Sequence, residues 1–117
     1  MKLLLALIFL MPLSLWANWN ADITLAVDGE TSKLASQVFI EGKQTSMSVG
    51  DYIVNLTLKQ RKAEKNLDVT YTVTEKTKKT LVNKGWDIIG DTGSNDIYAK
   101  GEPNQPNSII TLNFKTK

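Results

Sequence analysis

The acidic residues between Asp87 and Glu102 are the first candidates for chemistry in this chain. Asp87, Asp91 and Asp96 follow one another closely, and Glu102 comes shortly after them. Clustered carboxylate and carbonyl oxygens are the ligands that hard cations such as Ca²⁺ prefer. The spacing reproduces neither an EF-hand loop nor a glycine-rich calcium repeat. We therefore expect no metal or cofactor and read these residues as acids of solvated turns, with a calcium loop as the alternative.

Asp91 stands in the segment Ile88-Ile89-Gly90-Asp91-Thr92-Gly93-Ser94. This segment resembles the active-site turn of aspartic proteases, where two apolar residues lead into a catalytic Asp-Thr-Gly. The resemblance implies a dimeric hydrolase in which two copies of Asp91 share a proton and one activates a water molecule. Asp, Thr and Gly are also residues that commonly occur in turns. We predict a turn between two strands, and keep an aspartyl-type hydrolase that uses Asp91 as the alternative.

Histidine and cysteine are absent from the chain. Their absence excludes Ser-His-Asp and Cys-His nucleophile systems, imidazole metal sites and acid–base chemistry by histidine. It also excludes disulfides, so a small domain must fold by burial alone. The residue types therefore favour a protein that binds over an enzyme.

The first residues have the layout of a cleavable export signal. One positive charge, Lys2, precedes an apolar run over residues 3–16 that is interrupted by Pro12 and Ser14, and the small residue Ala17 ends it. This arrangement is typical of a secretory signal and predicts cleavage after residue 17. A spanning helix needs about 20 apolar residues, whereas the run over residues 3–16 is shorter and contains a proline. We therefore predict a cleaved signal and no transmembrane segment after cleavage. We expect a periplasmic or secreted protein, with a bacterial source favoured by the lack of cysteine.

Residues 18–117 are enough for one domain. The chain has 14 Lys and Arg against 12 Asp and Glu, and Lys2 belongs to the signal, so the balance after cleavage is close to neutral. Such a balance does not attract nucleic acid, and we expect no nucleic-acid partner. Two basic stretches, residues 59–65 and 76–79, contain Lys62, Lys78 and Lys79. We interpret them as solvated turns, with contacts to glycan or anionic lipid as the alternative.

Alternation of apolar and polar residues predicts β-strands along the whole domain. Ile23, Leu25 and Val27 alternate with polar or small residues, and Asp28-Gly29 then supplies a turn. Similar alternation or short apolar runs predict strands near residues 38–40, 45–49, 52–59, 67–74, 86–89, 97–98 and 110–115. Residues 31–35 could form a helical turn, and residues 76–83 fit a strand or a short helix. Short strands at such spacing predict an all-β fold, a small antiparallel β-sandwich of about 7–8 strands.

The two halves of the domain, residues 22–60 and 67–117, share a pattern. Each reads as strand, strand, glycine turn, strand, glycine turn, strand, with Gly42 and Gly50 in the first half and Gly93 and Gly101 in the second. A duplication predicts two pseudo-symmetric four-stranded sheets packed face to face; common hairpin length is the alternative origin. The strand–glycine–strand pattern over residues 23–114 resembles the repeats of small exported bacterial proteins distantly related to secretin β-domains. This resemblance implies a periplasmic accessory or binding role and assigns no functional residue.

Two aromatic residues, Phe39 and Tyr98, are expected on the strand faces opposite the core. Exposed aromatic side chains can anchor a partner protein or stack on a sugar. Together with Lys62, Lys78 and Lys79 they are the predicted partner contacts. The sequence thus predicts a non-enzymatic exported binding or scaffold protein that acts through another exported or envelope protein, without indicating its oligomeric state.

Overall fold

A computed structural model describes residues 18–62 and 64–115 of the chain. The export segment predicted over residues 1–17 lies outside the described residues. The eight strands are β1 (Asn18–Val27), β2 (Glu30–Ile40), β3 (Gln44–Val49), β4 (Tyr52–Gln60), β5 (Asn66–Glu75), β6 (Leu81–Gly90), β7 (Gly93–Ala99) and β8 (Ser108–Phe114). No helix in the described part of the chain has the length and apolarity that crossing a membrane requires.

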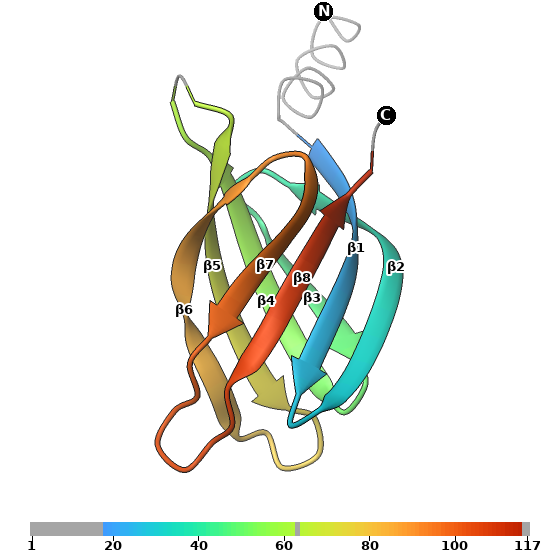
Figure 1. The fold of residues 1–117 in the computed structure, drawn as a ribbon, viewed down its shortest axis with the longest axis vertical. Helices are drawn as coiled ribbons and strands as arrows, with labels where there is room; N and C mark the ends of the chain where they lie inside the picture. Colours follow the sequence, from blue (N-terminus) through green and yellow to red (C-terminus); the bar gives the residue numbers. More distant parts are fainter. Residues whose placement is uncertain (1–17, 63, 116–117) are drawn as a thin grey trace, which may run out of the picture.

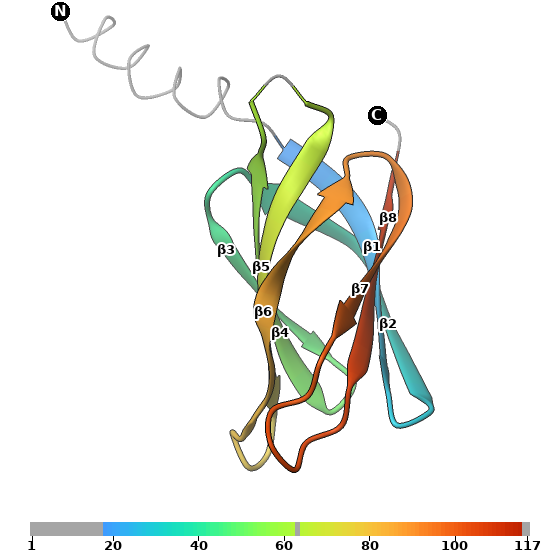
Figure 2. The same cartoon turned by 60° about the vertical axis from the view of Figure 1, so that its left-hand side comes forward.

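The strands form two antiparallel sheets of four strands that pack face to face (Figures 1 and 2). The strand order is β2-β1-β8-β7 in the first sheet and β3-β4-β5-β6 in the second. We call these sheets A and B. The prediction of a small all-β sandwich is confirmed.

Each half of the chain contributes one hairpin to each sheet. The strands β1 and β2 join β7 and β8 in sheet A, while β3 and β4 join β5 and β6 in sheet B. Strands four positions apart in the chain occupy equivalent places in the two sheets. When β1, β2, β7 and β8 are replaced by β5, β6, β3 and β4, the order of sheet A becomes that of sheet B read from its other edge. The topology therefore has a pseudo-two-fold axis, under which the edge strands β3 and β7 are equivalent. Descent of the two halves from one repeat stays a prediction.

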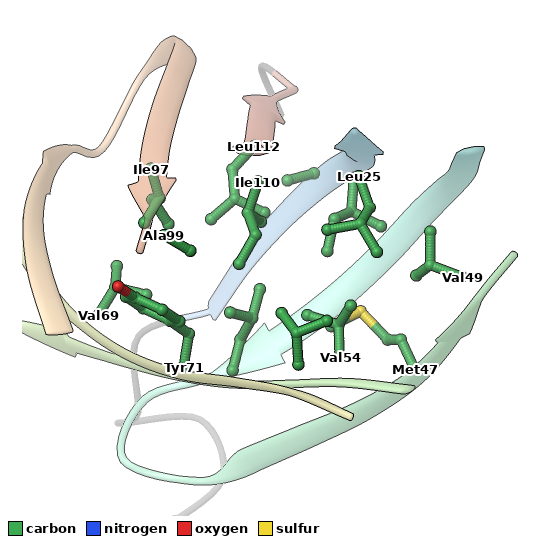
Figure 3. Packing of buried hydrophobic residues seen from close by; sticks show 14 of the residues in the cluster. Leu25, Met47, Val49, Val54, Val69, Tyr71, Ile97, Ala99, Ile110 and Leu112 are labelled. Atoms are coloured by element: carbon green, nitrogen blue, oxygen red, sulfur yellow. The ribbon is translucent and has the colours of Figure 1, made fainter. Parts of the chain in front are cut away.

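The core lies between the sheets and consists of one face of every strand. In β1, β4, β5 and β8 the buried positions alternate with partly or fully exposed ones, the period of two that the sequence shows. Figure 3 shows the two inner faces meeting, with Leu25, Ile110 and Leu112 from sheet A opposite Val54 and Val69 from sheet B. Because the chain has no cysteine, apolar burial at this interface stabilises the fold without disulfides.

The helical turn expected at residues 31–35 is wrong, because β2 occupies them. Asp28 and Gly29 adopt positive φ angles of 50° and 80° and form a tight hairpin turn. This turn leads directly into β2, whose residues pair with β1 from Glu30 opposite Val27 onward. Local propensity is overridden by pairing across the hairpin. Residues 76–83, which fit a strand or a short helix in the sequence, contain a connection and the start of a strand. Residues 76–80 connect β5 to β6, and β6 begins at Leu81.

A β-bulge in β2 is held by Asp22 of β1. The register between the two strands shifts opposite Asp22, where Ser36 adopts a φ of 54°. The Asp22 carboxylate accepts a hydrogen bond of 2.8 Å from the Ser36 N–H and lies 3.3 Å from the Lys115 ammonium. The hydrogen bond from Ser36 lowers the pKa of Asp22 from its ordinary value of 3.8, and Lys115 lowers it further against the opposing effect of desolvation.

The lowered pKa of Asp22 makes the stability of the fold depend on pH. Because the folded-state pKa is below the unfolded value of 3.8, the contribution is complete above that value and is lost as the pH falls through the folded-state pKa. We expect Asp22→Asn to be less stable than wild type at about pH 7, and the difference to shrink as the pH falls below 3.8. Urea unfolding of both proteins across this range measures it. A difference that does not change with pH would contradict the role of the charge.

Candidate functional site

A depression on the outer face of sheet A is the best-formed candidate site. Ala26 of β1, Ile109 of β8 and Tyr98 of β7 are directly opposite one another across three adjacent strands, so their side chains form one row. Because the Ala26 side chain is small, the surface is recessed at Ala26 beside the larger Ile109 and Tyr98. The resulting depression has a volume of about 510 Å³. It is lined by Ala26, Asp28, Gly29, Tyr98, Ala99, Lys100, Asn107, Ser108 and Ile109.

Tyr98 dominates the wall of this depression. Its side chain is 72% exposed, and that of Ile109 beside it is 37% exposed. The expectation that Tyr98 lies on the face opposite the core is confirmed. A large aromatic side chain in water, next to an aliphatic one, can release considerable apolar surface from water when a partner covers it.

Polar groups surround the apolar floor of the depression. Asp28 and Gly29 enter from the β1–β2 hairpin turn, and Lys100 and Asn107 come from the two ends of the β7–β8 loop. The Asn107 side-chain oxygen accepts a hydrogen bond of 2.8 Å from the Gly101 N–H, which closes the base of that loop. A carboxylate, an ammonium and an amide around an apolar floor give directional contacts to a bound group.

A buried polar cluster fixes the β7–β8 loop against sheet B. The Asn83 side chain on β6 is fully buried, and its amide nitrogen donates to the Pro106 carbonyl at 3.1 Å and to the Ala99 carbonyl at 3.4 Å. The Ser108 hydroxyl donates to the Asn83 side-chain oxygen. Each polar group of Asn83 thus has a partner, as burial requires. This cluster holds the loop that carries Lys100 and Asn107 into the site.

The loop also packs too tightly for a side chain at Gly101. A Cβ atom there would lie 2.2 Å from the Gln105 carbonyl oxygen and 2.5 Å from that of Pro106. Gly101 and Asn83 form an isolated β-bridge, which joins the start of the loop to β6. The wall of the depression is therefore part of the folded framework.

Phe39 does not belong to any surface site. The prediction that it lies on an outer face is wrong: the side chain is 1% exposed and is among the largest fully buried ones. Its residue pairs with Trp19 of β1, and both side chains point toward the core. The bulge at Ser36 explains the error, because one extra residue shifts the alternation in β2 and exposes Val38 instead.

The predicted lysine contacts are exposed but do not join the depression. Lys62 lies in the β4–β5 connection, and Lys78 and Lys79 lie in the β5–β6 connection, which is at the opposite end of sheet B (Figure 1). None of the three lines the depression at Tyr98. Tyr98, Lys62 and the pair Lys78 and Lys79 thus lie in three separate surface regions, and Phe39 lies in the core.

The basic stretch around Lys62 carries its own counter-charges. The Arg61 guanidinium contacts the Glu64 carboxylate at 3.0 Å and the Asp68 carboxylate at 2.8 Å. Hydrogen bonds to these two carboxylates, first to Asp68 and then to Glu64, raise the pKa of Arg61 above its already high ordinary value. The local field of this turn is therefore weaker than the run of lysines in the sequence suggests.

Asp91 lies in the short connection between β6 and β7. Asn95 closes this turn: its side-chain oxygen accepts from the Gly90 N–H at 3.0 Å, and its amide nitrogen donates to the Thr92 carbonyl at 3.0 Å. The predicted turn between two strands is confirmed. Within residues 18–62 and 64–115, no three acidic side chains gather in a way that could hold a metal ion, and the calcium loop is not formed there.

Comparisons with other proteins give no family. No family model, curated protein or solved structure matches the chain.

Several features of the site are not evident from sequence reasoning. Ala26 and Ile109 read as ordinary strand residues, and only their register with Tyr98 brings them together. Trp86 is 69% exposed on the outer face of sheet B, where its neighbour across the strands is Thr70. Trp86 lies an odd number of residues from the half-buried Gly85 and the buried Ile89, and this alternation is the signal that could have placed it on the opposite face.

The buried cluster at Asn83 gives a stability prediction. Replacing Asn83 with Ala leaves the Ser108 hydroxyl and two carbonyl groups without their partner, and we expect a loss of about 2 kcal/mol of unfolding free energy. Asn55→Ala is the matched control, because Asn55 donates to Thr72 at 3.1 Å on the outer face of sheet B. It should cost at most about 0.5 kcal/mol. Equal losses in denaturant unfolding would contradict the role assigned to the cluster.

The Asp91 turn gives a prediction about activity. We expect wild type and Asp91→Asn to behave identically in an assay for cleavage of unfolded protein substrates at acidic pH, because Asp91 serves in a turn. Activity that is present in wild type and lost in Asp91→Asn would contradict this and establish the hydrolase.

Proposed function

We propose that this chain is an exported, non-enzymatic accessory protein that binds another exported or envelope protein. The contact surface is the depression on sheet A that contains Tyr98. Cleavage of residues 1–17 would release the domain into the periplasm or the extracellular medium. The resemblance of the strand–glycine–strand pattern to exported secretin-related repeats agrees with such a role.

The observation that carries the proposal is the exposed Tyr98 beside Ile109 at the rim of a formed depression. Residues that dominate binding energy in protein interfaces are enriched in Trp, Tyr and Arg and lie in pockets that exclude water on binding. The Tyr98 side chain is 72% exposed, so most of its surface is available for burial by a partner. A partner side chain entering the depression would contact Ala26 and Ile109 and leave Asp28 and Lys100 at the rim.

The lysine-rich turns support binding to glycan or anionic lipid less well. Attraction of an anionic surface needs several cations whose field adds up. Around Lys62, the carboxylates of Glu64 and Asp68 lie within ion-pair distance of Arg61 and reduce that field. We therefore assign the binding role to the depression.

Photo-crosslinking in the native cells tests this function. With a benzophenone amino acid at position 98, we expect one dominant crosslinked protein, whereas the same group at position 86 should give none. Trp86 is the matched control, because it is an equally exposed aromatic residue on the outer face of sheet B. Tyr98→Ser should then weaken binding of the identified partner by at least about tenfold, a typical loss for an aromatic anchor.

Two results would contradict the proposed function. One is crosslinking from position 86 with none from position 98. The other is partner binding that is unchanged by Tyr98→Ser and is lost when Lys62, Lys78 and Lys79 are replaced by Gln together.

A further inference from the structure

One hydrogen bond of sheet A determines which backbone groups of β7 face its free edge. The Lys115 N–H donates to the Asn20 carbonyl at 2.8 Å, so these two residues form a hydrogen-bonded pair between β8 and β1. In an antiparallel ladder such pairs recur at every second residue. The β8 residues whose backbone N–H and C=O groups point toward β7 are therefore the even-numbered ones. They are Ser108, Ile110, Leu112 and Phe114, and they pair with Ala99, Ile97, Asn95 and Gly93.

The backbone groups of the remaining β7 residues point away from the sheet. By the same alternation, Ser94, Asp96 and Tyr98 direct their N–H and C=O groups to the outer edge. β7 is the last strand of sheet A on this side, and no described strand pairs with that edge. The N–H and C=O groups of these three residues are thus available to an added strand, at the spacing that a β-ladder requires.

The edge of β6 is closed at both ends. The Arg61 N–H donates to the Asn66 carbonyl, which therefore faces β4, and the even-numbered residues of β6 face outward. Ile88 donates its N–H to the Asp87 carboxylate at 2.7 Å, and Gly90 donates to Asn95. At the other end the Val82 carbonyl accepts from the Glu102 N–H at 2.8 Å. Such local caps are a known protection of sheet edges.

The edges of β2 and β3 offer less to a partner strand. The bulge at Ser36 interrupts β2. β3 is the pseudo-symmetric equivalent of β7, and its outward residues are Gln44, Ser46 and Ser48. These small or polar side chains supply no apolar anchor. Of the four described edges, β7 combines an uninterrupted set of backbone groups with a large exposed apolar side chain.

We propose that the partner contributes an extended segment that pairs antiparallel with β7 as an added strand of sheet A. Ser94, Asp96 and Tyr98 would each exchange two backbone hydrogen bonds with it, up to about six in all. The segment carries an apolar residue opposite Tyr98 and, two residues away, a Lys or Arg opposite Asp96. This inference rests on the proposed function and adds the chemistry of the partner.

Charge argues for a different protein and against a second copy of the chain. A two-fold pairing of β7 with its own copy that uses all three residues is centred on Asp96. It would place the two Asp96 carboxylates directly opposite each other, and like charges at that position are destabilising. A basic residue of another protein meets the carboxylate favourably.

A peptide experiment tests strand addition directly. Dodecapeptides from a random display library are selected on the purified protein, and those whose binding is lost with Tyr98→Ser are retained. Hydrogen exchange is then measured by NMR with and without a retained peptide. We expect the amides of Ser94, Asp96 and Tyr98 to exchange at least about tenfold more slowly with the peptide, because each gains a hydrogen bond.

Proline variants provide the matched comparison. Asp96→Pro removes an N–H that faces the outer edge, so β7 still pairs with β8, and peptide affinity should fall by at least about tenfold. Ser46→Pro makes the same change on the equivalent strand β3 and should leave affinity unchanged. Asp96→Ala keeps the N–H and should weaken binding less than Asp96→Pro.

Strand addition is overturned if the retained peptides leave these three amides unprotected and bind Asp96→Pro as well as wild type. That result leaves the proposed function intact, because crosslinking from position 98 decides it separately. It is also overturned if no library peptide depends on Tyr98, or if the same amides become protected with rising protein concentration alone, which would identify a second copy as the occupant.

Discussion

Burial of one face of each strand between two sheets is the interaction on which the rest of this structure depends. With no cysteine available, the fold must gain its stability from apolar side chains such as Ile23, Leu56 and Leu112, all of them fully buried. The alternation of a strand then sends every second residue outward. Residues on the outer faces do not pack in the core, so their side chains can serve in binding.

The same architecture creates the edges that a sandwich must manage. Each open sheet ends in two strands with unpaired backbone groups, which invite unwanted pairing. In this protein the β6 edge is capped by Asp87, Asn95 and the β7–β8 loop, and the β2 edge is broken by a bulge that Asp22 holds. The pseudo-symmetry of the topology makes β3 and β7 comparable, and they differ in what their side chains offer. We attribute binding to β7 because Tyr98, which forms the wall of the depression, belongs to that strand.

Most of the fold follows from the sequence, since period-two alternation and turn residues determine strands locally. The strands around Leu56, Val69 and Leu112 are predicted because their apolar residues alternate without interruption. The errors come from β2, where pairing across the Asp28-Gly29 turn makes residues 31–35 a strand. A bulge then reverses the faces of Val38 and Phe39. A bulge depends on the side chain of Asp22 in another strand, and local pattern does not reveal it.

The candidate site is only partly predictable for a related reason. The exposure of Tyr98 follows from its place beside the buried Ile97, so alternation is sufficient. The depression depends on the register that sets Ala26 and Ile109 in one row with Tyr98, and on the loop that Asn83 and Ser108 fix from a distance. Register and long-range hydrogen bonds are properties of the assembled sheets.

We infer that the outer face and edge of β7 form the binding surface. Mapping of backbone amide shifts by NMR, with the crosslinked partner added to the labelled protein, tests it most directly. The account predicts that the largest changes fall on residues 94–100 and on Ala26 and Ile109, with sheet B unaffected. Changes confined to the connections that carry Lys62, Lys78 and Lys79, or to the face around Trp86, would contradict it.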